Sequence, residues 1–118
     1  MHQPPRVDAE DRPRFRLVRI TGEIDVTNVR RLATALEEAI PNDGSVVAVD
    51  LSGTSYIDSV GIQLLFTVAE RFRDRRRELR LVVPDAAPIR AVLELTALTR
   101  TVPAVATVDA LDASIRRG

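Results

Sequence analysis

The sequence has 118 residues and carries 17 basic against 17 acidic side chains, so its formal net charge is zero. This length predicts one domain, and the charge balance argues against an electrostatic surface for nucleic acid or anionic membranes. Aromatic residues make up only 3% of the chain and cysteine is absent, which argues against base-stacking surfaces and excludes disulfides and thiolate chemistry.

Residues 1–13 are polar, charged and contain several prolines, and they predict either a flexible arm or a weak edge strand. The segment Phe15–Ile20 then alternates in the period of two that is typical of a strand. Phe15 and Leu17 are expected to point to one face of a sheet, with Val18 and Ile20 on the other. Thr21-Gly22-Glu23 is predicted to end this strand.

Residues 29–40 place apolar side chains at helical spacing and charged ones on the opposite face, which predicts an amphipathic helix. Asp25, Thr27 or Asn28 are suitable residues to cap its first turn. The continuous apolar run Val46–Val49 follows and is typical of a central strand covered on both faces.

Residues 50–55 form a polar connection, after which the apolar pattern from Val60 to Phe72 predicts a long helix. This helix ends in an arginine-rich run, residues 71–77, where cations meet the negative end of the helix dipole. We interpret the run as a solvated helix end rather than a nucleic-acid patch.

The last third of the chain predicts a strand over Leu79–Val83 and a short helix over 86–95 with Pro88 in its first turn. Val105–Val108 is predicted to be the last strand, and Asp109 to cap a final helix. The alternation predicts an α/β fold, with a mostly parallel or mixed sheet of about four to five strands and about four packed helices. We expect one domain over residues 14–118.

An enzyme is disfavoured because the sequence lacks the residues that catalysis needs. The single histidine, His2, lies in the expected arm, and lysine is absent, so neither an anchored triad base nor lysine chemistry is available. No metal-ligand spacing and no phosphate-binding glycine motif occurs. Asp50 follows a predicted strand as in a receiver domain, but the receiver's acidic pair and lysine are not found. We therefore predict no catalytic residue, no metal and no cofactor.

The chain also lacks an apolar run long enough to span a membrane, and its first residues do not resemble a signal peptide. These absences, together with the lack of cysteine, predict a soluble cytoplasmic protein with no membrane insertion and no direct contact with nucleic acid.

The segment Ser52–Gly61 combines hydroxyl residues and an acid at the start of the long predicted helix. A helix N-terminus carries unpaired N–H groups and partial positive charge, so a phosphate on Ser59 could be accommodated there. That phosphate would add about −1.5 to −2 charges to a docking surface. By local chemistry alone, Asp58 or Ser59 is an ordinary helix cap.

The order of several short motifs resembles the STAS domain of bacterial anti-sigma factor antagonists. These motifs are Gly22-Glu23-Ile24-Asp25, Val49-Asp50-Leu51-Ser52-Gly53, Tyr56-Ile57-Asp58-Ser59-Val60-Gly61, Ile89 to Leu98 and Val108 to Leu111. The resemblance implies that the protein binds an anti-sigma factor that is also a serine kinase, and thereby controls transcription indirectly. In this family the kinase phosphorylates a serine that matches Ser59, the antagonist is released, and a phosphatase resets it.

The same resemblance implies a partner-binding surface around Ser59, made of Asp25, Asn28, Thr54, Ser55, Asp58, Val60, Gly61 and Gln63. The family often has a second serine where this chain has Val60, and Leu-Gly where it has Ile62-Gln63. An alternative is a STAS subunit that docks permanently in a larger assembly, such as a lipid-transport ATPase complex or a stressosome-like scaffold. The sequence does not indicate an oligomeric state.

Overall fold

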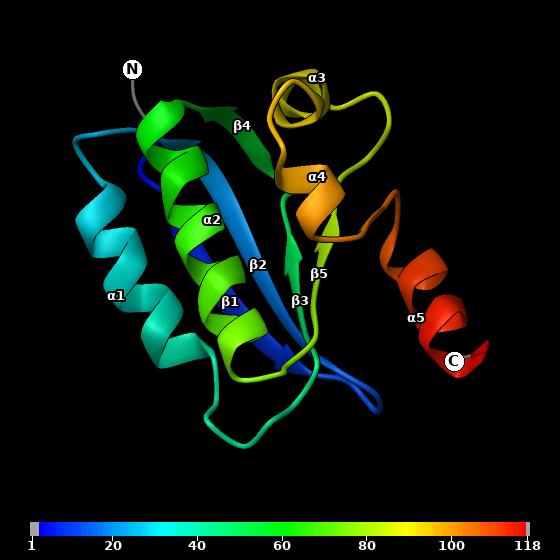
Figure 1. Cartoon of the computed structure of the whole chain (residues 1–118). Helices are drawn as coiled ribbons and strands as arrows, with labels where there is room; N and C mark the ends of the chain where they lie inside the picture. Colours follow the sequence, from blue (N-terminus) through cyan, green and yellow to red (C-terminus); the bar gives the residue numbers. More distant parts are fainter. Residues whose placement is uncertain (1–2, 118) are drawn as a thin grey trace.

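Six strands form one mixed sheet in the computed structural model, which describes residues 3–117 (Figure 1). The strand order is β1-β2-β3-β5-β6, and β4 pairs with the far end of β2. Only β1 runs antiparallel to its neighbour; the other pairs are parallel. The strands are β1 (Arg6–Asp11), β2 (Arg16–Ile24), β3 (Val47–Asp50), β4 (Thr54–Ile57), β5 (Leu79–Val82) and β6 (Ala104–Val105).

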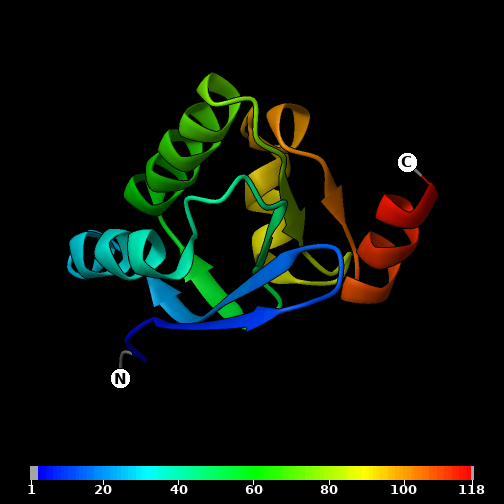
Figure 2. The same ribbon diagram turned by 90° about the horizontal axis from the view of Figure 1, so that it is seen from below.

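Five helices pack on this sheet: α1 (Val29–Ala39), α2 (Ser59–Asp74), α3 (Pro88–Glu94), α4 (Leu98–Thr101) and α5 (Val108–Arg117). The first two lie side by side, and α5 lies apart from them beside β6 (Figures 1 and 2). The predicted α/β class and mixed sheet are confirmed. The short helix α4 was not predicted, because four residues are too few to establish a helical period.

The core has two parts, one on each face of the sheet. Val18 and Ile20 of β2 belong to the larger part, which α1 to α4 cover. Phe15 and Leu17 face the other side and pack with Leu111 of α5. The predicted alternation before and within this strand is therefore confirmed. The central position predicted for the apolar run at 46–49 is also confirmed, since every residue of β3 is buried.

The N-terminal segment forms an edge strand, which is one of the two forms expected for it. β1 pairs antiparallel with β2, and Val7 opposite Ile20 turns toward the core. The remaining residues of β1 are charged or small and exposed, as is typical of an edge strand that avoids further pairing. His2, also assigned to this segment, lies outside the described residues.

The predicted break at residues 21–23 is wrong, because β2 continues through it to Ile24. Gly22 takes a positive φ of 99°, and the pairing of β2 shifts register between Gly22 and Glu23. Beyond this irregularity the strand pairs with β4 instead of β3. Residues 54–57, part of which was predicted to be a polar connection, therefore form a strand.

The predicted helix caps also need correction. Asn28 occupies the cap position of α1, but its side chain makes no capping hydrogen bond. Asp109 lies inside the first turn of α5, and the side chain of Thr107 is the cap, accepting from the Ala110 N–H at 3.0 Å. The last strand is shorter than predicted, because residues 106–107 already turn into α5.

Candidate functional site

Two parallel strands, β2 and β4, bring together the loops that follow them. Ile24 and Ile57 are paired at the ends of these strands, so the turn after Ile24 meets the N-terminus of α2 after Ile57. The site consists of this turn, residues 25–28, together with β4 and the first turn of α2. Figure 1 shows it at one end of the molecule, with α3 nearby.

Asp58 joins the two segments through its carboxylate. One oxygen, Oδ1, accepts from the N–H groups of Val60 and Gly61, both at 3.0 Å, and so caps α2. The other, Oδ2, accepts from the N–H of Val26 in the 25–28 turn at 3.1 Å. Both oxygens are therefore used to hold the site in shape, and Asp58, one of the two cap candidates from local chemistry, is the cap of α2.

Asp25 and Asn28 shape the neighbouring turn. The Asn28 amide donates to the Glu23 carbonyl at 3.0 Å and accepts from the Asp25 N–H at 3.1 Å. Asp25 Oδ1 in turn accepts from the Thr27 N–H at 2.9 Å. These bonds hold the turn in one conformation, with Val26 at its exposed tip.

Ser59 is the first residue of α2 and is exposed. Its hydroxyl makes no hydrogen bond to any residue within the described range. The N–H groups of Val60 and Gly61, which we expected to accommodate a phosphate, already bind Asp58. A phosphate on Ser59 would have to displace Asp58 to reach them, or else point away from the helix.

Two residues expected to bind a partner are buried. Thr54 is 3% exposed, and its hydroxyl donates to the Ile20 carbonyl at 2.8 Å. Gly61 lies where α2 crosses the sheet: a Cβ there would come within 2.7 Å of both Ile24 and Ile57. Their assignment to a partner surface is therefore corrected, because both side-chain positions are used to pack β4 and α2 against β2.

Three other residues of the expected surface are exposed. Ser55 lies on β4 and donates from its hydroxyl to the Gly22 carbonyl at 3.4 Å. Val60 and Gln63 lie on the first two turns of α2. Together with Ser59, they give this end a surface of mixed polar and apolar character.

Sequence reasoning missed the most exposed apolar side chains of the site. Val26 is 65% exposed and Tyr56 is 50% exposed, and Leu95 just after α3 reaches 89%. Together with Val60 and Val92, these three residues are all the large apolar residues that are exposed in the described part of the chain. The period of β4 could not have identified Tyr56, because a residue two positions after the buried Thr54 is expected to be buried as well; the irregular pairing of β4 with β2 leaves it exposed.

These five residues, which we call the apolar end, lie on the elements around Ser59, since α3 packs beside β4 (Figure 1). Clustered exposed apolar side chains are typical of protein-binding surfaces. No group of three or more His, Cys, Asp or Glu side chains within the described residues is arranged to hold a metal ion. No helix among them is long and apolar enough to cross a membrane.

Comparison with known proteins gives a consistent result. The sequence model of the STAS domain matches residues 6–111. Two proteins called anti-sigma-B factor antagonists, from Listeria monocytogenes and Listeria innocua, are each 34% identical over 62 residues. That match covers 52% of this chain and 54% of each relative, so the chain spans about half the length of the curated relatives it matches.

Solved structures are similar over nearly the whole chain. An anti-sigma factor antagonist from Mycobacterium paratuberculosis superposes with a TM-score of 0.83 at 25% identity, covering 98% of this chain and 99% of that one. The Bacillus cell fate determinant SpoIIAA in its phosphorylated form gives a TM-score of 0.60 at 17% identity, covering 92% and 99%. This second likeness concerns the fold alone.

Proposed function

The chain belongs to the STAS domain family, and we propose that it is an anti-sigma factor antagonist whose binding to its partner is switched off by phosphorylation of Ser59. Anti-sigma factor antagonists are regulators and not enzymes. The proposed partner is an anti-sigma factor with serine kinase activity, which supplies ATP and Mg²⁺, and a phosphatase reverses the modification. The protein itself needs no cofactor.

One observation carries the proposal: an exposed serine at a helix N-terminus is followed directly by the exposed Val60 and lies close to the turn that carries the exposed Val26, whose N–H binds Asp58. Val26, Tyr56 and Val60 are side chains that a monomer leaves in water and that a partner can bury. Ser59 is accessible to a kinase and is held by no hydrogen bond from its hydroxyl within the described residues. The same surface can therefore bind a protein and be modified.

The geometry also supports release by phosphate. A phosphoserine brings about −1.5 to −2 charges at neutral pH. Here it would lie next to the Asp58 carboxylate, which already occupies the N–H groups of Val60 and Gly61. The dianion would therefore be poorly compensated by the helix, and burying it among apolar side chains would cost desolvation energy. Weakened partner binding follows without any loss of fold.

The test is a binding and phosphorylation assay with a candidate anti-sigma kinase. The wild-type protein is incubated with the kinase and ATP, and the modified residue is mapped by mass spectrometry. Ser59→Ala should keep binding and lose the phosphate, while Ser59→Asp should weaken binding. Ser55→Ala is the matched control, because Ser55 is an exposed serine on the adjacent strand. The Ser55→Ala variant should still be phosphorylated on Ser59.

Two results would contradict the proposal. One is a phosphate mapped to Ser55 or elsewhere; the other is no phosphate from a kinase that demonstrably binds. Stable co-purification with an ATPase or scaffold, unaffected by Ser59→Asp, would instead favour a permanent docking subunit.

A further inference from the structure

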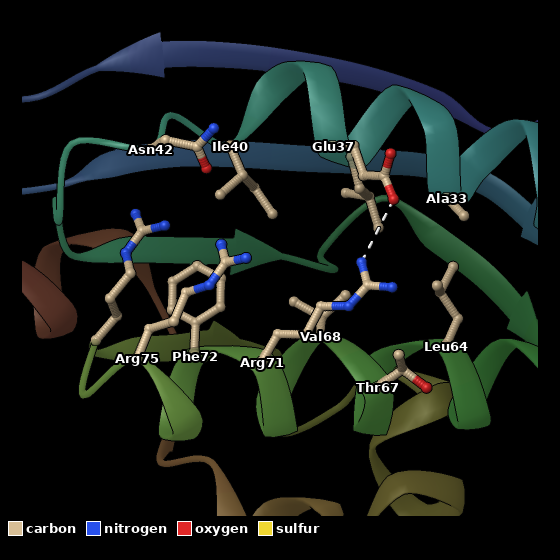
Figure 3. A pocket seen from close by; sticks show the side chains of 12 residues that line it. Ala33, Glu37, Ile40, Asn42, Leu64, Thr67, Val68, Arg71, Phe72 and Arg75 are labelled. Carbon is tan, nitrogen blue, oxygen red and sulfur yellow. Dashed lines mark hydrogen bonds and ion pairs between the residues drawn. The ribbon is translucent and has the colours of Figure 1, made fainter.

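A second surface feature lies along α2. It is a groove of about 450 Å³ between α1 and α2 that runs from Leu64 to the arginine-rich end of α2 (Figure 3). At about 1.5 Å of rise per residue, Leu64 at its near end lies about 8 Å from Ser59 along the helix, and Phe72 toward its far end lies about 20 Å from it. The arginine-rich end of the groove is therefore separate from the proposed phosphorylation site.

The floor of the groove is apolar. Leu36 and Ile40 contribute from α1 and its end, and Leu64, Val68 and Phe72 from α2. Figure 3 shows the labelled residues from the two helices facing one another across the groove. A volume of about 450 Å³ falls within the range of about 300–1,000 Å³ that small-molecule pockets occupy.

The rim is cationic. Arg71, Arg75 and Arg77 line the groove, while Glu37 is the acidic residue that also lines it. Arg71 pairs with Glu37 at 3.4 Å, across the groove (Figure 3). Arg75 and Arg77 form no ion pair within 4.0 Å among the described residues, although the charge of Arg77 acts on Asp43 and, in addition to the hydrogen bonds that this carboxyl accepts, helps to lower its pKa.

These arginines are not needed to cap the helix. The final carbonyl groups of α2 accept from backbone N–H groups instead, for example Phe72 from the Arg77 N–H at 2.8 Å and Arg73 from the Arg76 N–H at 3.0 Å. The side chains of the run therefore make other contacts. The sequence predicts a solvated helix end here, and the structure places Arg71, Arg75 and Arg77 of the run on a groove.

Arg77 lines the groove and is held by its own contacts. Its guanidinium lies 4.5 Å from the centre of the Phe72 ring, and one of its terminal nitrogens donates to the Ser45 carbonyl at 3.0 Å. Its Nε is buried and has no hydrogen-bond partner within the described residues. Buried donors are rarely left unpaired in folded proteins.

We propose that this groove binds a small amphipathic anion, an aliphatic carboxylate whose chain packs on the apolar floor and whose oxygens bind Arg75 and Arg77. A guanidinium matches the two oxygens of a carboxylate, which makes arginine side chains on the rim suitable partners for that group. The apolar floor explains why the ligand needs a hydrocarbon chain in addition to its charge.

The test is an NMR titration of the isolated full chain with octanoate. Saturable shifts are expected at amides of residues 33–42 and 64–77, and the melting temperature should rise with octanoate concentration. Acetate, which has the carboxylate without the chain, and 1-octanol, which has the chain without the charge, should each bind at least about tenfold more weakly, as expected when one of the two contacts is lost. Since no kinase is present, the outcome is independent of Ser59.

Arg75→Gln should weaken octanoate binding by about fivefold to tenfold, which corresponds to the loss of one charge-assisted contact. Arg73→Gln is the matched control: Arg73 is exposed on the same helix but does not line the groove, and binding should change by less than about twofold. Several outcomes would overturn the proposal: equal binding of acetate, which indicates an adventitious ion only; equal binding of octanol; shifts mapped elsewhere; or no effect of Arg75→Gln. Binding of an acidic amphipathic peptide without binding of octanoate would also overturn it and assign the groove to a protein partner.

Discussion

Replacing Asp58 separates its two structural roles. Asp58→Asn keeps an oxygen that can accept from the N–H groups of Val60 and Gly61, but it places an NH₂ group against the N–H of Val26. The loss of that acceptor should lower the free energy of unfolding by about 1–2 kcal/mol. Asp58→Ala also removes the cap, which adds about 1–2 kcal/mol, for a total of about 2–4 kcal/mol.

The assay is urea denaturation together with amide hydrogen exchange. In Asp58→Asn the Val26 amide should lose protection, while the amides of Val60 and Gly61 should keep most of theirs. Asp109→Asn is the control, because Asp109 lies in the first turn of α5, whose cap is Thr107. Asp109→Asn should lower the free energy of unfolding by only about 0.3–1 kcal/mol, which is the contribution of a carboxylate interacting with the helix dipole.

The reasoning is refuted if Asp58→Asn is as stable as the wild type with Val26 exchange unchanged. It is also refuted if the Asn and Ala variants are equally destabilised, because the cap and the link to the turn would then not be separable contributions.

Three further predictions concern other parts of the fold. Arg76, two residues after the end of α2, has a φ of 55°, so Arg76→Gly should raise the free energy of unfolding by about 0.5–1 kcal/mol; a lower urea midpoint would contradict this. Gly61→Ala should lower the free energy of unfolding by about 1–2 kcal/mol, because the new Cβ would lie 2.7 Å from Ile24 and this clash outweighs the higher helix propensity of alanine. An unchanged urea midpoint would contradict this, because it would show that α2 shifts without cost. The hydrogen bonds from the Ser45 hydroxyl and N–H lower the pKa of Asp43 below its ordinary 3.8, so Ser45→Ala should raise that pKa in a carboxyl NMR titration. Because the pKa of Asp43 is lower in the folded state than in the unfolded state, ionised Asp43 stabilises the wild-type fold at pH values above 3.8. This stabilisation is lost as the pH falls through the folded-state pKa, so the free energies of unfolding of Ser45→Ala and wild type should converge in acid.

Much of the architecture could be predicted from residues close together in the sequence. The period of two around Leu17 and Val18 correctly assigned side chains to the two faces of the sheet. The apolar run at 46–49 identified the central strand, and the helical period from Val60 to Phe72 identified α2. Each of these patterns depends on neighbours within a few residues, which is why the sequence alone contains them.

The errors share a long-range cause. Residues 21–23 were predicted to be a break and residues 54–55 part of a polar connection, because each segment is short and polar. They become strands only when they pair with each other. Thr54 shows this directly, since its hydroxyl binds the carbonyl of Ile20, which lies 34 residues earlier in the chain.

The sequence by itself determined the family, the fold class and the position of Ser59 beside a helix-capping Asp58, because these depend on motif order, periodicity and local capping. Only the tertiary structure decided which residues around Ser59 are exposed. The parallel pairing of β2 with β4 buries Thr54, brings Asp58 to the Val26 turn and leaves Tyr56 in solvent. Burial depends on which distant segments meet, and a linear pattern does not contain that information.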